Sequence, residues 1–492
     1  MPLIDFQKIW EQFLYHPDQP MIFNSGFFLL LFTGFLFLFY LIQKNQRAKL
    51  IFVTIFSYYF YYKSSGIYFL VLMSVTIVDY RLAEMISRAV IHRKKKFLLI
   101  ASLLINLGTL AYFKYTNFLT DIFSGLTGDA DRNFDIFLPV GISFFTFQSL
   151  SYTIDIYRGN LKPAPSFLDY AFYLSFFPQL VAGPIVRAAD FMPQIRKATM
   201  VTREMLGTGI FLIVTGLFKK AIISNYISLN FVDRVFDAPG LYSGLENLLA
   251  VYGYALQIYC DFSGYSDMAI GIALLLGFHF NINFNSPYKS VNITEFWRRW
   301  HISLSGWLRD YLYISLGGNR KGKWRTYVNL MLTMLLGGLW HGAAMRFIIW
   351  GGLHGLGLAV HKFYTGLKLP LPVTGRTVLN ITGGIFTFHF VCFCWIFFRA
   401  PDLETVSNMI HQITSSFSGF LLPQFLTGYR EVSLLMVTGY VLHFLPASAE
   451  KWGKERVTEL PLAGKILLMT GIIWLVIQTK SAGIQPFIYF QF

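Results

Sequence analysis

Charged residues are scarce in this chain. Only 14% of its 492 residues are Asp, Glu, Lys or Arg, and 54% are hydrophobic, whereas a soluble domain typically carries about 25% charged residues. Apolar runs recur from Phe27 to Ile477 with no long polar interval between them. The composition therefore argues against an ordinary soluble enzyme, and it predicts an integral membrane protein with a single membrane domain over residues 1–492.

Cysteine is equally sparse, and the short signatures of several enzyme classes are missing. Cys260, Cys392 and Cys394 all lie in apolar surroundings, so they are too few for a disulfide framework and are expected to be buried small hydrophobic residues. The chain contains no HExxH, CxxC, P-loop or GxSxG signature. These absences give little support to a zinc protease, a nucleotide hydrolase or a serine hydrolase, and no metal site is expected.

The sequence also shows no signal peptide. Its first residues, MPLIDFQKIWEQ, mix charged and polar side chains, whereas a signal peptide has a positive region followed by an apolar stretch. The first apolar run is therefore expected to remain as a helix. A spanning helix needs about 20 largely apolar residues. The runs that approach this criterion are 25–42, 49–63, 67–82, 97–113, 167–185, 206–224, 246–260, 268–280, 326–341, 346–362, 379–398, 432–446 and 463–478.

The predicted architecture is an all-α bundle of about 11–13 membrane helices around a central funnel. Some apolar runs are short and contain Gly and Pro, notably LPVGISFFTFQSLSY from Leu138 and FFPQLVAGPIV from Phe176. Such broken or re-entrant helices persist in a membrane only where protein surrounds their backbone or where they line a cavity. Within the domain we expect N-terminal helices over 1–130, a catalytic core over 131–365 and C-terminal helices over 366–492.

The formal net charge of +15 predicts topology more readily than a nucleic-acid partner. Lys and Arg form short clusters between apolar runs, at 44–49 and 88–96, and such clusters mark cytoplasmic loops. The N-terminus, with Asp5, Glu11 and Asp18, is then expected outside the cytoplasm, and the basic segment 285–325 inside it. We expect a multi-pass membrane protein that binds no nucleic acid.

A histidine inside an apolar run is the first candidate for chemistry. Trp340 and His341 lie in LLGGLWHGAAMRFIIWGGLHG, with glycines on both sides, and ionisable residues at membrane depth are functional candidates by default. The alternative is a histidine that bonds a neighbouring helix; small neighbours would let a substrate or another backbone approach the ring. If one helix continued from His341 through His354, these two residues would lie about 20 Å apart. His361 is expected at the interface.

Two further segments carry polar residues between apolar ones. In NITEFWRRWHISLSGWLRDYLYISLGGNRKGKWR, apolar residues recur at helical spacing from Phe296 to Tyr311, which predicts an amphipathic helix with His301 on its polar border. Asn292 and Glu295 fit a capping box at its start. The loop 317–323 that follows is cationic and rich in glycine, so it is either a phosphate-binding loop or a solvated turn.

The segment QIYCDFSGYSDMAIG places Asp261 and Asp267 between two apolar runs. Carboxylates in such a position require partners or water. One interpretation is a structural pair with an arginine of the cationic loop. The other is a contact with substrate.

Five segments in this order resemble the membrane-bound O-acyltransferase family, specifically its alginate O-acetyltransferase branch. The likeness is strongest over Gly141–Gly355 and extends more loosely over the whole chain; the ending FIYFQF also fits. The segments are GISFFTFQSLSYTIDIYRG from Gly141, FFPQLVAGPIVR from Phe176, QIYCDFSGYSDMAIG from Gln257, FWRRWHISLSGWLRDYLYISLGGNRKG from Phe296 and GGLWHGA from Gly337.

The resemblance implies transfer of an acetyl group from a cytoplasmic thioester, acetyl-CoA, to an extracytoplasmic polysaccharide such as alginate. The transfer is direct or passes through a periplasmic or membrane-tethered acetyltransferase partner. The family's defining histidine matches His341, and a second polar position matches His301. The relatives that attach D-alanine to teichoic acid have a less arginine-rich helix at this point, so the acetylating branch fits better.

Attack of a hydroxyl on a thioester requires a base and a donor that stabilises the oxyanion. A neutral histidine in an apolar chamber suits the base, so we expect His341 in that role, with His301 orienting the acceptor or donating to the thioester oxygen. Trp340 would exclude water. Asp261 is expected to contact substrate, and the cations expected to meet the phosphates of coenzyme A are Arg320, Lys321 and Lys323.

No tightly bound cofactor is expected beyond this donor substrate. Transfer of D-alanine or another acyl group to a cell-wall polymer remains an alternative, as do two other classes of function. Broken helices and buried carboxylates also occur in transporters and channels, and a membrane scaffold for a secretion machine would have no need of a buried histidine.

Overall fold

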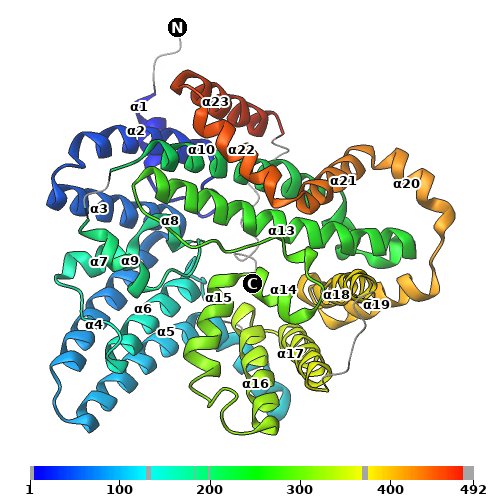
Figure 1. The fold of residues 1–492 in the computed structure, drawn as a ribbon, viewed down its shortest axis with the longest axis horizontal. Coiled ribbons are helices and arrows are strands. Elements are labelled where there is room, and N and C mark those ends of the chain that lie inside the picture. The colour runs from blue at the N-terminus through cyan, green and yellow to red at the C-terminus, as the bar shows by residue number, and fades with distance from the viewer. Residues whose placement is uncertain (1–4, 129–133, 182, 198–199, 368–374, 480–492) are drawn as a thin grey trace. The chain divides into compact units, whose positions relative to one another are not determined.

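The computed structural model describes residues 5–128, 134–181, 183–197, 200–367 and 375–479, and every regular element in these ranges is a helix (Figure 1). The all-α fold predicted from the sequence is therefore confirmed. The chain divides into two compact units, one formed by Met1–Gly209 with Met268–Asn281 and the other by Ile210–Asp267 with Ile282–Ser481. The division into a single membrane domain with three sequential parts stays a prediction.

Three of the described helices are long and apolar enough to cross a membrane. They are His92–Thr127, Arg203–Asp237 and Thr377–Arg399. A fourth crossing is possible at the pair Arg430–Phe444 and Ala447–Glu459, whose axes differ by 94°. Shorter apolar helices occupy Gly26–Ile42 and Leu462–Gln478. Long, short and bent apolar helices together agree with a helical membrane protein, while the total number of spans and the central funnel stay predictions.

The first unit begins with helices that start at side-chain caps. Ser25 accepts a hydrogen bond from the backbone N–H of Phe28, and Asn45 accepts one from that of Ala48, which satisfies amide groups left free in a first turn. The elements of this unit are α1 (Phe6–Phe13), α2 (Gly26–Ile42), α3 (Gln46–Ser65), η1 (Gly66–Tyr68), α4 (Phe69–Arg88), α5 (His92–Thr127), α6 (Ile142–Arg158), α7 (Phe167–Ser175), α8 (Phe177–Leu180) and α9 (Ala188–Ile195), with α10 (Arg203–Leu217) leading into the second unit.

A buried carboxylate holds three helices of the first unit together. Asp79 of α4 is fully buried and accepts hydrogen bonds from Ser102 at 2.7 Å and Asn106 at 2.6 Å, both on α5, and from Ser149 on α6. Burying a carboxylate is costly unless its oxygens are hydrogen-bonded. The three donors meet that requirement, so this polar cluster favours one register among α4, α5 and α6.

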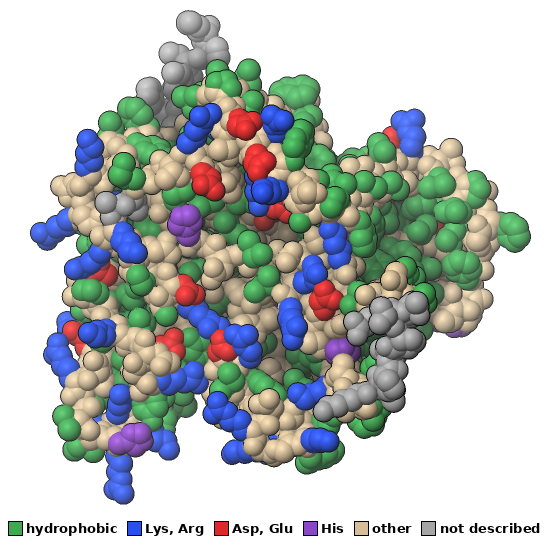
Figure 2. Space-filling model, viewed as in Figure 1, with side chains coloured by type: hydrophobic (Ala, Val, Ile, Leu, Met, Phe, Trp, Pro, Cys, Tyr) green, Lys and Arg blue, Asp and Glu red, His purple; other side chains and the backbone are tan. Residues whose placement is uncertain are grey.

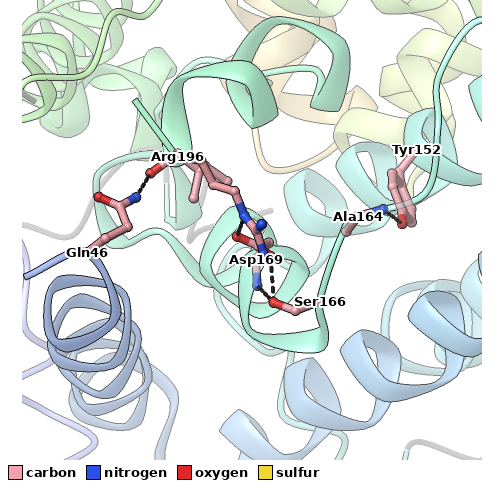
Figure 3. Close-up of polar contacts among 7 residues, drawn as sticks. Gln46, Tyr152, Ala164, Ser166, Asp169 and Arg196 are labelled. Atoms are coloured by element: carbon pink, nitrogen blue, oxygen red, sulfur yellow. Dashed lines mark hydrogen bonds and ion pairs between the residues drawn. The ribbon is translucent and has the colours of Figure 1, made fainter. Parts of the chain in front are cut away.

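The region around the predicted segment FFPQLVAGPIVR is broken, as the Gly and Pro content predicts. Helix α7 ends at Ser175, and α8 is a short helix from Phe177 to Leu180. Arg196 lies over α7 and bonds Asp169 through two nitrogens, at 2.9 and 2.6 Å, while Ser166 donates to the same carboxylate at 2.5 Å (Figure 3). Burial alone would raise the pKa of Asp169, but the hydrogen bonds and the charge of Arg196 lower it.

The second unit holds every residue predicted to take part in chemistry. Its elements are η2 (Phe218–Ser224), α11 (Asn225–Ile227), η3 (Ser228–Val232), α12 (Asp233–Asp237), η4 (Pro239–Leu241), α13 (Gly244–Leu275), η5 (Pro287–Lys289), α14 (Ile293–Arg299), α15 (Ile302–Trp307), η6 (Leu308–Tyr313), α16 (Lys323–His341), α17 (Met345–Gly366), α18 (Gly375–Arg399), α19 (Leu403–Ser415), η7 (Gly419–Leu421), α20 (Leu422–Gly428), α21 (Arg430–Phe444), α22 (Ala447–Glu459) and α23 (Leu462–Gln478). Segments η2, η3 and η6 are π-helical.

Exposed hydrophobic side chains are frequent in the second unit. Phe420 in η7 is 95% exposed and Leu434 in α21 is 65% exposed. Figure 2 shows hydrophobic side chains gathered on the part of the face that projects to the right, with Lys and Arg scattered over the rest. Soluble proteins rarely expose apolar surface on this scale. The surface suits a lipid environment.

The predicted span 246–260 and the first part of the predicted span 268–280 lie on one continuous helix, α13, which ends at Leu275. The polar residues between them do not end the helix, because their charges are paired with lysines of η2 and because Gly264 lets that segment approach closely. A Cβ atom at Gly264 would lie 3.1 Å from the backbone nitrogen of Lys220 in η2 and 2.7 Å from the carbonyl oxygen of Gly216 at the end of α10. The prediction of two separate spans was therefore wrong at this point.

Candidate active site

His341 is the last residue of α16, and a tight turn joins that helix to α17. Gly342 has an extended backbone that ends the helix, and a Cβ atom there would lie 1.9 Å from the ring of Phe347. Further along the hairpin, a Cβ at Gly338 would meet the carbonyl oxygen of Phe347 at 2.2 Å, and one at Gly351 that of Met334 at 2.3 Å. Gly338 thus permits the backbone of α17 to approach α16, and Gly342 makes room for the ring of Phe347.

The turn changes the expected position of His354. A continuous helix would separate it from His341 by about 20 Å, but α16 stops at His341 and α17 folds back along it (Figure 1). The ring of Trp350 lies 5.0 Å from that of His341 and 4.7 Å from that of His354, measured between centroids. His354 is therefore a near neighbour of His341, with one indole between them.

His341 is buried among aromatic rings. Its side chain is only 3% exposed, and its ring centroid lies 5.0 Å from Trp340, 5.0 Å from Trp350 and 5.3 Å from Phe398. Rings at these distances pack closely around the imidazole and leave it little contact with bulk water.

His301 occupies a break in the predicted amphipathic helix. Helix α14 ends at Arg299 and α15 starts at Ile302, and His301 between them has φ 41° and ψ 57°. This left-handed conformation costs a residue with a side chain about 1–3 kcal/mol, and such outliers cluster at functional sites. The prediction of one continuous helix was wrong here. The apolar residues at helical spacing are nevertheless buried, namely Phe296, Trp300, Leu304, Trp307, Leu308 and Tyr311.

A network around Asn283 stabilises this break. The backbone carbonyl of Asn283 accepts from the amide of Ile302 at 2.9 Å, and its side-chain oxygen accepts from the amide and the hydroxyl of Ser303 at 3.2 and 2.9 Å. Its side-chain nitrogen donates to Ser266 at 3.2 Å. Asn283 is buried, and the sequence offered only an asparagine between two apolar runs as a signal for it. It is the main positioning residue that sequence reasoning missed.

The protonation of His301 follows from its contacts. Burial lowers the pKa of His301 to about 3, so the ring is neutral near pH 7. Its Nδ1 accepts a long hydrogen bond, 3.4 Å, from the backbone N–H of Leu304. Because a backbone N–H only donates, the single proton of the neutral ring lies on Nε2. In this tautomer, His301 presents a hydrogen-bond donor.

One indole connects the two predicted histidines. The ring of Trp340 lies 6.3 Å from that of His301 and 5.0 Å from that of His341. Elements α15 and α16 thus bring together three of the predicted site residues that are separated by up to 40 positions in the chain. All three side chains are buried.

Asp261 pairs with a lysine and not with an arginine of the cationic loop. Lys220 of η2 donates to Asp261 at the centre of α13, and both side chains are buried. One turn and a half further on, Lys219 donates to Asp267 at 2.7 Å. The partner predicted for this segment was therefore wrong, whereas the requirement for a partner was right. Substrate contact by Asp261 stays a prediction.

The cationic loop lies at the opposite end of α16 from His341. Positive φ angles at Gly317, Gly318 and Gly322 shape the turn, and Asn329 donates to the carbonyl of Gly318 at 2.9 Å. The 19 residues of α16 correspond to a rise of about 27 Å between the loop and His341. The fold thus does not bring the loop into the histidine cluster. The exposed cations of the loop are Arg320, Lys321 and Lys323.

Asn292 caps α14 as predicted, because its side chain accepts from the backbone N–H of Glu295 at 2.9 Å. His361 is half-buried and its Nδ1 contacts the hydroxyl of Thr294 at 2.8 Å. The three cysteines are buried and unpaired by disulfides. Among the described residues, no group of three or more His, Cys, Asp or Glu could hold a metal ion.

Comparison with known proteins gives a consistent family. Residues 160–399 match the model of the MBOAT, or membrane-bound O-acyltransferase, family. Pseudomonas aeruginosa has a protein named "probable alginate O-acetylase AlgI" that is 40% identical over 86% of this chain and 81% of its own length. The Pseudomonas putida protein of that name is 37% identical over 96% of this chain and 100% of its own length.

A relative with another substrate in its name is nearly as similar. The peptidoglycan O-acetyltransferase of Helicobacter pylori is 37% identical over 79% of this chain and 79% of its own length. Matches of this identity over most of both chains leave no room for an unrelated fold. This chain therefore belongs to the membrane-bound O-acyltransferase family, and it is an acyltransferase of a membrane.

Proposed function

We propose that this protein transfers an acetyl group from a cytoplasmic thioester, acetyl-CoA, towards an extracytoplasmic polysaccharide such as alginate. The observation that carries the proposal is that the rings of His301 and His341, both buried, lie 6.3 and 5.0 Å from the same Trp340 indole. Relatives named for acetylation of alginate and of peptidoglycan support the acetyl group and the sugar acceptor.

In this proposal, His341 is the general base. It takes the proton of the acceptor hydroxyl as the oxygen attacks the thioester carbonyl, and the proton then passes to the departing thiolate. His301, with its proton on Nε2, donates to the oxygen that becomes negative. Trp340, whose ring is close to both histidines, excludes water, which would otherwise hydrolyse the thioester.

His341→Ala tests the proposed base. General-base removal commonly lowers the rate about 10²–10⁴-fold, so the variant should insert into membranes normally and lose acetyl transfer. The matched control is His361→Ala, on α17 at a distance from the aromatic cluster, which should stay active. Normal insertion together with parental transfer by His341→Ala would contradict the assignment. Loss of thioester consumption in the same variant separates an acyltransferase from a transporter.

Donor binding is assigned to the cationic loop at the start of α16. Its cations, Arg320, Lys321 and Lys323, are exposed and suit phosphate groups as point charges. Because the loop is about 27 Å from His341 along α16, the donor would have to lie along that helix. Replacing all three by Gln should raise the Michaelis constant for acetyl-CoA with little loss of kcat. An unchanged Michaelis constant for acetyl-CoA would mean that the loop only determines membrane topology.

The proposal places the protein in a bacterial inner membrane with its N-terminus outside the cytoplasm and the segment 285–325 inside. The basic clusters at 44–49 and 88–96 support that orientation. A periplasmic or membrane-tethered acetyltransferase would receive the acetyl group if transfer is relayed. Labelling of cysteines introduced at Asp18 and at Lys323 tests the topology, and labelling of both from one side would contradict it.

A further inference from the structure

His354 is a buried histidine whose protonation the structure determines. Its side chain has no exposed surface, and its Nδ1 faces the indole N–H of Trp297 at 3.3 Å. An indole nitrogen donates and cannot accept, so Nδ1 of His354 must be the acceptor. The proton of the neutral ring is then on Nε2.

That Nε2–H and a neighbouring indole N–H have no acceptor among the described protein atoms. Nε2 of His354 and Nε1 of Trp350 are both buried without a hydrogen-bond partner. The two residues are four positions apart on α17, hence on one face of the helix, and their ring centroids are 4.7 Å apart. A buried donor without an acceptor costs about 1–3 kcal/mol. Two adjacent ones indicate a place for an acceptor that the chain itself does not provide.

The surroundings define the chemistry of that acceptor. Aromatic rings contact the pair on several sides: Phe296, Trp297 and Phe390 around His354, and Trp395 and Phe398 around Trp350. An ionised group would lose its hydration here without a countercharge. A neutral carbonyl oxygen accepts two hydrogen bonds and carries no charge, so it fits this pair of donors.

The position of the pair connects it with the proposed reaction. Trp350 contacts His341, with ring centroids 5.0 Å apart, so its indole belongs to the wall of the histidine cluster. We infer that His354 and Trp350 form a subsite that binds a carbonyl oxygen of the acyl donor, either the thioester carbonyl or an amide carbonyl of the carrier arm. This inference rests on the proposed function, because it takes the donor from it.

Binding measurements on the full-length protein in lipid nanodiscs test the subsite. Three probes are acetyl-CoA, its S-ethyl thioether analogue without the thioester carbonyl, and adenosine 3′,5′-bisphosphate without the arm. His354→Phe removes the Nε2 donor and keeps an aromatic ring. Loss of one or two such hydrogen bonds should weaken binding of the affected probe about tenfold. Trp350→Phe should act in the same direction and replaces His354→Phe if that variant does not fold.

The pattern across the probes identifies the carbonyl. Weaker binding of acetyl-CoA alone assigns the subsite to the thioester carbonyl, and equal weakening of acetyl-CoA and the thioether assigns it to an amide of the arm. Unchanged binding of both, or equal weakening of all three probes, would overturn the subsite. The control is His443→Phe: His443 is also buried, and its Nε2 faces the amide of Tyr288 at 3.1 Å, but its ring neighbours differ. This variant should keep the parental affinities.

The proposed function and the proposed carbonyl subsite can be refuted separately. A parent chain that binds acetyl-CoA and transfers its acetyl group, while His354→Phe binds all probes normally, refutes the subsite and leaves the proposed function intact. A parent chain that does not bind acetyl-CoA refutes the proposed donor and, with it, the ligand of this subsite.

Discussion

Replacing Asp261 with Asn tests which of two tasks its buried carboxylate performs. The side chains of Asp261 and its partner Lys220 are 5% and 1% exposed, so bulk water solvates neither charge. Removing one partner from a buried pair leaves the other uncompensated, which commonly costs about 3–5 kcal/mol. Asp261→Asn should therefore lower the thermal unfolding midpoint of the purified protein markedly.

The double variant Lys220→Met/Asp261→Leu separates stability from substrate binding. Replacement of both partners by hydrophobic residues removes the uncompensated charge, and in other proteins it is neutral or stabilising by about 1–4 kcal/mol. If the pair serves packing alone, the double variant should recover both the unfolding midpoint and acetyl transfer. A stable but inactive double variant would refute that reasoning and return Asp261 to the substrate.

The neighbouring pair provides an internal control for the magnitude. Lys219 and Asp267 are 27% and 21% exposed in their side chains, so water screens this pair more than the buried one. Asp267→Asn should therefore destabilise the protein less than Asp261→Asn does. Equal losses would mean that burial does not determine the cost at these positions.

Three further predictions concern positions outside this pair. Asn283→Ala removes the side-chain bonds to Ser266 and Ser303 that support the break at His301, so acetyl transfer should fall while donor affinity persists; parental transfer would exclude a positioning role. Gly351→Ala places a Cβ 2.3 Å from a backbone carbonyl and should destabilise by about 1–3 kcal/mol, whereas Gly352→Ala meets only a leucine methyl at 3.6 Å and should fold normally, as melting curves will show. The lowered pKa of Asp169 stabilises the fold above the unfolded-state pKa of about 4, and that stability is lost as pH falls further; Asp169→Asn should flatten this dependence, and an identical profile would exclude the ion pair as its cause.

Elements defined by hydrophobic length were predictable. The runs 25–42 and 49–63 correspond closely to α2 (Gly26–Ile42) and α3 (Gln46–Ser65), because an apolar stretch with polar ends determines where a membrane helix starts and stops. The broken helices near Pro178 were predictable for the opposite reason, since Pro and Gly interrupt helical hydrogen bonding.

Elements whose course depends on partners far along the chain were not predictable in this way. The lysines that neutralise α13 come from a π-helical stretch some 40 residues earlier, and no local pattern indicates such a pairing. Without it, the polar residues 261–267 read as an interruption between two spans. The pairing turns the same residues into part of one helix.

The candidate site shows the same division between residue types and geometry. His341 and Trp340 were selected by their chemistry in apolar surroundings, and His301 by the resemblance to the family. Helical periodicity, however, placed His301 on a helix and set His354 far from His341. Both errors have one cause: periodicity assumes continuous helices, and the chain breaks at His301 and after His341.

These breaks are what bring the site together. Had α14 and α15 formed one helix, the polar backbone groups at 300–302 would have bonded within it, and the amide of Ile302 would not reach the carbonyl of Asn283. Had α16 continued through Gly342, Trp350 could not lie against His341. Local rules of helix formation tend to fail where a fold accepts strain for function. At His301 the strain is a left-handed backbone, and the neighbouring Asn283 is the residue whose removal should let it relax.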